Sequence, residues 1–237
     1  MLLSNNDIKQ ELIKAKNLAI YPLKLDNIKG SSVNLTASRY AWNIKDRKTA
    51  VTQDKKKIVI PPNNTVCIFA TEAIWVSRRI GGTYHPRVSL VARGLSNIST
   101  TLDPQWHGLS LVAVNNPTDS SIEIKVGEAF VSVMLYYLQT PATKGIIENQ
   151  ASRPDIYSRF ELEYDEELFL AEQWHRNYEG IVTKMLSSES YEYLYKEKMK
   201  FWKKLSTFFG HNLTAGIIGG LFVAIISGVI LFMLGID

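Results

Sequence analysis

Short hydrophobic runs separated by turn residues follow one another along the first 140 residues of the chain. The runs are rich in β-branched and aromatic residues, which is typical of strands, and no long helical pattern lies between them. The predicted strands are 18–23, 32–41, 57–60, 65–76, 108–114, 122–126 and 129–138. This pattern predicts an all-β barrel or jelly roll, preceded by one short helix at residues 4–15 that Ser4 caps.

A helical period replaces the strand pattern after Phe160. We expect the apolar side of this helix to carry Leu168, Trp174, Tyr178, Ile181 and Met185. Six acidic residues between 161 and 172 suit the start of a helix, and we interpret them as a solvated surface. A polar interruption is expected at residues 187–190. A second helical stretch follows, with five lysines between Lys196 and Lys204.

Residues 213–234 form a run of 22 residues without a charged side chain. At about 1.5 Å per residue, a helix of this length spans roughly 33 Å, which is enough to cross the hydrocarbon core of a membrane. Lysines precede this run and no basic residue follows it, so we expect a single-pass helix in the cell inner membrane with the N-terminal domain in the cytoplasm. The expected organisation is a β domain (1–158), a helical linker (159–210) and a transmembrane segment (211–237).

Small residues recur every four positions within the expected span, at Gly216, Gly220, Ala224 and Gly228. A stripe of this kind allows membrane helices to approach closely. It predicts that the helices of several copies pack together, so the protein is expected to be a homo-oligomer. The alternative is the ordinary enrichment of glycine in membrane helices.

Composition argues against a disulfide-stabilised protein and against a metal-binding protein. Cys67 is the only cysteine, so no intrachain disulfide can form, and we expect this residue to be buried and apolar. His85 and His107 lack neighbours at metal-ligand spacing, and no metal or other cofactor is expected. The net charge of +4 is mild. The lysines near the C-terminus suit anionic lipid headgroups better than nucleic acid.

Four segments of the β region are more specific than the strand pattern. They are 66–76, 85–95, 101–109 and 124–130. In order and spacing they resemble the trimeric dCTP deaminase/dUTPase family, and the resemblance extends over about residues 1–155. It implies a jelly-roll barrel, a nucleotide ligand and a trimer whose sites lie between neighbouring subunits.

The resemblance implies roles for individual residues in binding. Arg87 and Ser89 match the family's Arg-Ser-Ser segment, which binds phosphate at the subunit boundary. Asp103, Trp106 and Gly108 match an Asp-Pro-x-Trp-x-Gly turn, which leads into the hairpin that holds deoxyribose and base. In the family, main-chain groups of this hairpin read the pyrimidine, and such groups survive a change of side chain.

The positions that would carry catalysis depart from the family pattern. Deamination needs a carboxylate that shuttles protons, and Ala113 stands where the family has this glutamate. Val88 replaces the first serine of the phosphate segment, and Ala92 replaces a second arginine. Arg93 is one step along, where a strand would point its side chain to the opposite face. We therefore expect no catalytic residues and no deaminase activity.

The sequence supports hydrolysis of dUTP no better than it supports deamination. Residues 139–160 lack the glycine-rich arm with which that branch of the family closes over a triphosphate. A phosphate-binding strap would have to come from residues 140–153, where Lys144 and Arg153 are the cations.

These features predict a membrane-anchored, catalytically inactive nucleotide sensor that controls a transmembrane oligomer. Its plan is similar to that of bacterial antiphage effectors, in which a nucleotide signal triggers permeabilisation of the inner membrane. The expected partners are a nucleotide or oligonucleotide, the membrane, further copies of the chain and an enzyme that produces the nucleotide signal. Two alternatives remain open. One is a membrane-tethered, active dCTP deaminase or dUTP pyrophosphatase, and the other is a ligand-free membrane scaffold.

Overall fold

The computed structural model of the 237-residue chain describes residues 1–97, 100–144, 153–209 and 226. The chain divides into two compact units, Met1–Glu192 and Tyr193–Asp237. The sequence places the end of the β domain at residue 158, whereas the first unit extends to residue 192. This unit therefore combines the β domain with the first part of the expected helical linker.

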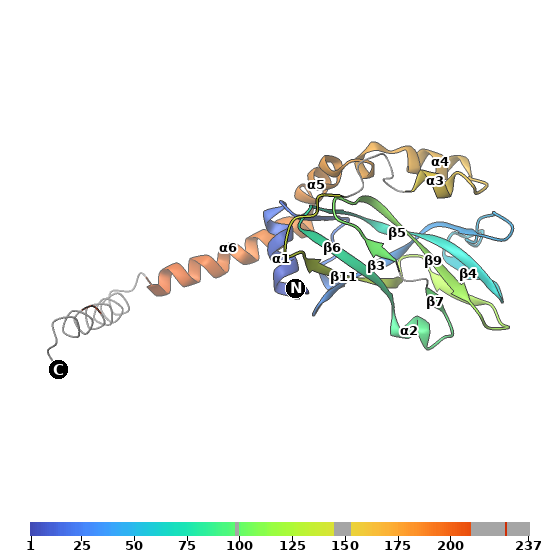
Figure 1. Cartoon of the computed structure of the whole chain (residues 1–237), viewed down its shortest axis with the longest axis horizontal. Helices are drawn as coiled ribbons and strands as arrows, with labels where there is room; N and C mark the ends of the chain where they lie inside the picture. Colours follow the sequence, from blue (N-terminus) through green and yellow to red (C-terminus); the bar gives the residue numbers. More distant parts are fainter. Residues whose placement is uncertain (98–99, 145–152, 210–225, 227–237) are drawn as a thin grey trace. The chain divides into compact units, whose positions relative to one another are not determined.

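The β domain consists of a curved antiparallel main sheet and a smaller two-stranded sheet (Figure 1). The strands of the main sheet are β1 (Leu18–Tyr21), β2 (Ile28–Lys29), β3 (Ser32–Asn43), β5 (Asn64–Val76), β6 (Ile80–Pro86), β7 (Ser96–Asn97), β8 (Thr101–Leu102), β9 (His107–Asn116) and β11 (Ala129–Tyr137). The smaller sheet pairs β4 (Lys57–Ile60) with β10 (Ile122–Lys125). The main order is β7-β9-β5-β3-β11-β6-β8, with β1 on β5 and β2 on β3. The predicted mainly β fold is confirmed.

Strand β6 is missing from the sequence prediction because Gly81, Gly82 and Pro86 give it the composition of a turn. In the structure it pairs with β11 along its whole length and with β8 at Gly82 and Thr83. Gly82 is required by the close approach of β11, since an added Cβ would lie 2.7 Å from the carbonyl oxygen of Met134. The glycine that suggests a turn therefore serves the packing of a central strand.

The N-terminal helix is confirmed as α1 (Asn5–Lys14). The Ser4 hydroxyl accepts a hydrogen bond from the backbone N–H of Asp7, whose carboxylate in turn accepts the Ser4 N–H at 2.9 Å. This reciprocal cap fixes the start of the helix, and Ile8 and Leu12 are fully buried beneath it.

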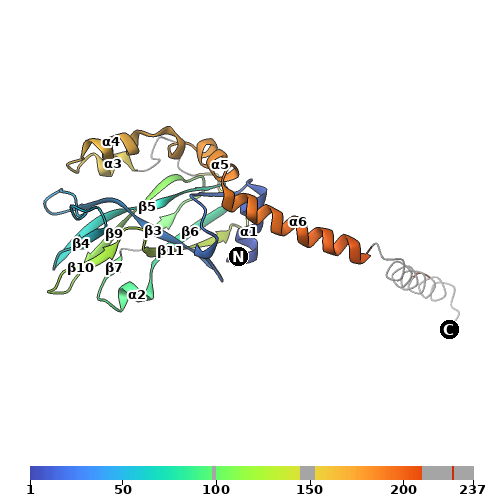
Figure 2. The same cartoon turned by 180° about the vertical axis from the view of Figure 1, so that it is seen from behind.

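The helices after residue 153 lie along one side of the β domain, opposite α2 (Val88–Val91) (Figures 1 and 2). They are α3 (Pro154–Tyr157), α4 (Tyr164–Ala171), the 3₁₀ turn η2 (Gln173–His175) and α5 (Tyr178–Leu186). Phe160 stacks on Trp42 with ring centroids 5.3 Å apart, and Phe169 stacks on Tyr40 at 4.3 Å. Fully buried Met185 accepts a hydrogen bond from the N–H of Ile20. These helices cover the sheet.

The structure corrects two details of the helical prediction. Leu168 is 53% exposed, and Leu170 is the buried leucine of α4, because η2 interrupts the expected helix and shifts its apolar side. Glu166, which we assigned to a solvated surface, is 4% exposed. The predicted interruption is confirmed, since α5 ends at Leu186 and α6 (Glu189–Phe209) begins three residues later.

The expected transmembrane span and its row of small residues at Gly216, Gly220, Ala224 and Gly228 lie outside the described residues. Within the part of the chain that the structure describes, we find no helix with the length and apolar character needed to cross a membrane.

Candidate functional site

The turn after β8 places the first group of predicted site residues. Asp103 is exposed, and its carbonyl oxygen accepts a hydrogen bond from the N–H of Trp106 at 3.1 Å. Gln105 has φ 69° in this turn, and Gly108 has φ 127° at the second residue of β9. Because φ 127° is open to glycine alone, Gly108 is a conformational requirement of the start of β9. Trp106 is 9% exposed.

Trp106 lines a cavity of about 50 Å³ at the place where β6 and β8 face β9. The residues around it are Tyr84, Thr100, Thr101, Trp106, Ser110, Leu111 and Arg153. The hydroxyls of Tyr84 and Ser110 lie 2.7 Å apart and share a hydrogen bond. Burial raises the pKa of Tyr84 well above its ordinary value, so its hydroxyl keeps its proton at neutral pH. None of these lining residues is a carboxylate.

Arg153 is the charged member of this lining and belongs to the segment from which the sequence analysis expects any phosphate strap. Its Nε and Nη2 atoms donate to the two carboxylate oxygens of Asp155 at 2.9 and 2.7 Å. Hydrogen bonding to Asp155 raises the pKa of Arg153, and the same contact lowers the pKa of Asp155. The arginine that lines this cavity is thus held by the carboxylate of Asp155.

Arg87 and Ser89 are not among the residues that line this cavity. Arg87 directly follows β6 and lies three residues after Tyr84, which does line it. Ser89 is exposed on α2. Within the described part of one chain, neither of the predicted phosphate residues contributes to the cavity lining.

The region after Arg87 is helical, which corrects the argument about Arg93. Residues 88–91 form α2, and Arg93 follows it in a turn, so the alternation of a strand does not apply. The Arg93 guanidinium donates to the carbonyl oxygen of Glu123, and its Nη1 lies 3.6 Å from Glu128 Oε1. Arg93 therefore contacts β10 and the turn that follows it.

Ala113 lies on β9 directly opposite Cys67 of β5. Cys67 is buried, as expected, and burial raises the pKa of its thiol to about 11. The sequence analysis overlooked the buried carboxylate of Glu72, which is 1% exposed and accepts hydrogen bonds of 2.8 Å from the N–H and the hydroxyl of Thr36. Both carboxylate oxygens are thus engaged inside the sheet. Among the described residues, no group of acidic, histidine or cysteine side chains has the arrangement of a metal site.

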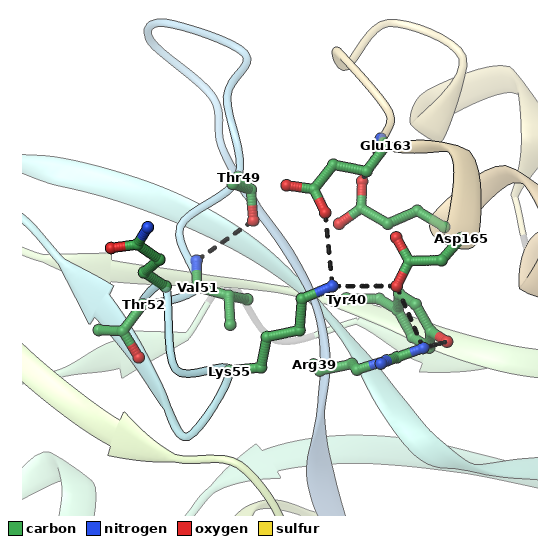
Figure 3. Close-up of a pocket in the computed structure, with 10 residues that line it drawn as sticks. Arg39, Tyr40, Thr49, Val51, Thr52, Lys55, Glu163 and Asp165 are labelled. Carbon is green, nitrogen blue, oxygen red and sulfur yellow. Dashed lines mark hydrogen bonds and ion pairs between the residues drawn. The ribbon is translucent and has the colours of Figure 1, made fainter.

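A larger cavity of about 350 Å³ lies between β3, the β3–β4 connection and α4 (Figure 3). Its wall carries an ion network in which Lys55 Nζ lies 3.1 Å from Asp165 Oδ2 and 3.5 Å from Glu163 Oε2. Arg39 Nη2 reaches the same Asp165 oxygen at 3.2 Å. The hydrogen bond with Lys55 lowers the pKa of Asp165 and raises that of Lys55.

These cations and carboxylates already satisfy one another and are about half exposed, so each pair adds little stability. Their effect is to hold the start of α4 against the β3–β4 connection. None of the predicted binding residues lines this cavity. Its paired charges join two parts of the same chain. The cavity at Trp106 is the better candidate for a ligand.

Comparison with known proteins identifies the family of the β domain. Residues 2–138 match the dCTP deaminase-like family. The chain is 27% identical over 127 residues to the dCTP deaminase of Thermococcus kodakarensis, covering 54% of this chain and 81% of that protein. It is 24% identical over 160 residues to the dCTP deaminase of Pyrococcus abyssi, covering 67% of this chain and 99% of that one.

Two solved structures align with part of the chain. The 2'-deoxycytidine 5'-triphosphate deaminase of Agrobacterium tumefaciens aligns with TM-score 0.47 and 12% identity over 58% of this chain, which spans 48% of that structure. The EIAV dUTPase aligns with TM-score 0.40 and 19% identity, covering 56% of this chain and 98% of the other. Since the matched residues 2–138 make up more than half of the sequence, the chain belongs to the dCTP deaminase-like family.

Proposed function

We propose that this protein binds a nucleotide without deaminating it, and that the bound nucleotide controls a membrane-embedded homo-oligomer. The observation that carries the proposal is Ala113, which occupies the position of the proton-shuttling glutamate in the family pattern. An alanine methyl group neither accepts nor donates a proton, so attack of water on C4 of cytosine has no general base at this point.

None of the described residues that line the Trp106 cavity carries a carboxylate. The Tyr84 hydroxyl keeps its proton because burial raises its pKa, and it is bonded to Ser110. The buried carboxylate of Glu72 is engaged by Thr36 within the sheet. Arg153 is a cation. This set of groups can hold a polar ligand by donating hydrogen bonds, which is a binding role.

The size of the cavity favours a shared site. About 50 Å³ accommodates only part of a nucleotide, because complete ligand pockets usually measure roughly 300–1,000 Å³. Arg87 and Ser89 do not line the pocket of their own chain. We propose that they complete the pocket of a neighbouring copy, which makes ligand binding and assembly interdependent. A trimer is the arrangement that the family resemblance implies.

The C-terminal part of the sequence links this domain to a membrane. The uncharged run 213–234 is long enough to span a bilayer, and the stripe that includes Gly220 suits close packing of helices from several copies. A ligand shifts such an assembly only as far as its affinity differs between two states. In the proposed role, an antiphage effector, a nucleotide signal favours the state that permeabilises the inner membrane.

Binding and turnover measured on the same preparation test the proposal. The full-length protein, purified in mild detergent, is titrated with dCTP and dUTP by calorimetry, and the products are separated by chromatography. Binding without product formation is the expected result. Turnover that disappears in Asp103→Ala would instead establish the membrane-tethered enzyme. Absence of binding to these and to cyclic and oligomeric nucleotides would leave the ligand-free scaffold as the better explanation.

A further inference from the structure

Two cations of the larger cavity converge on one carboxylate oxygen. Lys55 Nζ lies 3.1 Å and Arg39 Nη2 lies 3.2 Å from the same atom, Asp165 Oδ2 (Figure 3). A lysine and an arginine that share one oxygen are a common environment for a bound phosphate. The Asp165 oxygen therefore marks a position at which these two cations can hold an oxygen of a phosphate group.

The β domain positions both cations through contacts of its own. The Arg39 guanidinium lies 5.2 Å from the centre of the Tyr40 ring, and its Nη2 donates to the Tyr40 hydroxyl at 3.2 Å. Lys55 belongs to a turn in which its N–H donates to the carbonyl oxygen of Thr52 at 2.7 Å. The Thr52 hydroxyl in turn donates to Asp54 at 2.7 Å. None of these bonds involves α4, so the two cations should keep their places when Asp165 moves away.

The space beside these cations is large enough for a ligand. The cavity measures about 350 Å³, within the range of roughly 300–1,000 Å³ that is usual for ligand pockets. Gln53 adds an exposed amide to the same wall, and Glu163 and Asp165 line the cavity from the side of α4. The contact between α4 and the β domain thus leaves a space of ligand size next to two cations.

Asp165 can leave the cations at a small cost in stability. The side chains of this ion network are between 38 and 46% exposed at the shared oxygen, and such pairs contribute little because water screens them. Other groups also attach α4 to the β domain. Phe169 stacks on Tyr40, and Glu166 accepts a hydrogen bond from Trp42. An anion can therefore displace the Asp165 carboxylate without detaching the helix.

We propose that Arg39 and Lys55 form a second anion-binding site, which takes a phosphate group and in which Asp165 is a built-in competitor. Phosphate suits the pair because arginine presents a planar set of donors and lysine supplies a compact charge. The site is separate from the Trp106 cavity and does not depend on the nucleotide proposed there. Phosphate binding removes the ion pairs at the start of α4, so occupancy of the site and the hold on α4 oppose each other.

The first test removes the competing charge. Full-length protein in detergent is titrated with inorganic pyrophosphate by calorimetry, with the ionic strength held constant by chloride. Asp165→Asn keeps the shape of the side chain, and we expect it to lower the Kd for pyrophosphate about fivefold. Glu167→Gln is the matched control, because Glu167 is exposed on the same helix and does not line the cavity. An equal gain in this control would reduce the effect to net charge and overturn the site.

The second test removes a cation. Lys55→Ala should raise the Kd for pyrophosphate about fivefold and, combined with Asp165→Asn, should cancel the gain of that variant. Lys57→Ala is the control, because Lys57 Nζ lies 2.7 Å from Glu123 and does not line this cavity. A gain in Asp165→Asn that persists without Lys55 would place the anion elsewhere and overturn the proposal.

Titration with dCTP distinguishes two sources of the phosphate. If a nucleotide supplies it, Asp165→Asn binds a second dCTP per chain, and Lys55→Ala removes this second molecule. If a free phosphate compound supplies it, pyrophosphate alone gains affinity and the stoichiometry of dCTP stays unchanged. Both patterns support the anion site. Absence of any Lys55-dependent binding of pyrophosphate or dCTP, in the wild type and in Asp165→Asn, overturns it, whether or not dCTP binds at the Trp106 cavity.

Discussion

The indole N–H of Trp42 donates a hydrogen bond of 3.1 Å to the carboxylate of Glu166, 124 positions further along the chain. Trp42 is fully buried and Glu166 is 4% exposed. The same carboxylate oxygen accepts the backbone N–H of Glu163 at 2.9 Å, which caps α4. The Glu166 carboxylate thus caps the start of α4 and attaches this helix to β3.

Substitutions at Glu166 measure how much the hydrogen bond from Trp42 contributes to stability. We expect Glu166→Ala to lower the free energy of unfolding by about 1–3 kcal/mol, because the buried Trp42 indole loses its acceptor. Glu166→Gln should cost less, since its amide oxygen can still accept that bond. The control is Glu167→Ala, the exposed neighbour on the same helix. Denaturant unfolding measures all three, and an equal effect of Glu166→Ala and Glu167→Ala would contradict the role of the Trp42 bond.

The length of a stable soluble fragment follows from the same packing. A fragment of residues 1–192 should melt cooperatively, because these residues form one compact unit. A fragment of residues 1–158 should melt at a lower temperature and aggregate, because it uncovers the Trp42 and Tyr40 rings. Thermal melts and light scattering of both fragments provide the test. Equal melting temperatures would show that the helices are a dispensable addition.

The sequence predicts the strands in which polar and apolar residues alternate and the strands that are apolar throughout. For β4 the predicted and observed ends are identical. The prediction misses β6, since a glycine that admits a neighbouring strand looks the same in sequence as one that makes a turn. Glu166 was assigned to the surface for a related reason: its buried partner Trp42 is remote in sequence. Long-range contacts decide such cases.

The candidate site likewise combines residues that are close in sequence with residues that are remote in sequence. Asp103, Trp106 and Gly108 are close in sequence, so a local motif groups them, and of the three Trp106 lines the cavity. Tyr84 of β6 and Arg153 before α3 reach the cavity from elements that are distant in sequence. The spacing between motifs could not show that Arg87 does not line the cavity of its own chain.

Glu72 should give stability a measurable dependence on pH. Burial raises the pKa of Glu72 above its ordinary value of 4.5, although hydrogen bonds from Thr36 act in the opposite direction. Because the folded protein holds this proton more tightly than the unfolded chain, the contribution of Glu72 to stability is greatest below pH 4.5. It is lost as the pH rises through the folded pKa.

The variant Glu72→Gln isolates this contribution, because glutamine has a similar shape and does not titrate. Relative to this variant, the wild type should become progressively less stable as the pH rises above about 4.5. Free energies of unfolding measured for both proteins across the acidic and neutral range give the difference. A difference that does not change with pH would show that the carboxylate titrates equally in both states.

Asp155 should compete with an anionic ligand for Arg153. In Asp155→Asn the guanidinium loses its charged partner, so we expect dCTP to bind roughly threefold more tightly, a modest gain because the pair is partly exposed. Arg153→Ala should weaken dCTP and have little effect on deoxycytidine, which lacks phosphate. The control Asp119→Asn changes an exposed carboxylate in the turn before β10. A gain of the same size in this control would attribute the effect to net charge.

The proposed coupling predicts that the two ends of the molecule fail in different ways. Gly220→Leu should keep the helices apart and abolish ion leakage caused by expression, while nucleotide binding persists. Phe222→Leu, which lies outside the row of small residues in the sequence, should leave leakage unchanged. Arg87→Ala should abolish ligand control and keep the protein in the membrane. Dye-leakage assays on expressing cells, paired with calorimetry on purified protein, measure both properties.

Mixed oligomers test why Arg87 matters. Arg87 does not line the Trp106 cavity of its own chain, so it serves the neighbouring copy if the site is shared. Arg87→Ala and Trp106→Leu each damage every site in a uniform oligomer. In a mixture, an intact Arg87 from the Trp106→Leu chain can meet an intact cavity in the Arg87→Ala chain. Co-expression should therefore restore part of the ligand response. If it restores none while both chains assemble together, Arg87 acts within its own chain and the shared site is wrong.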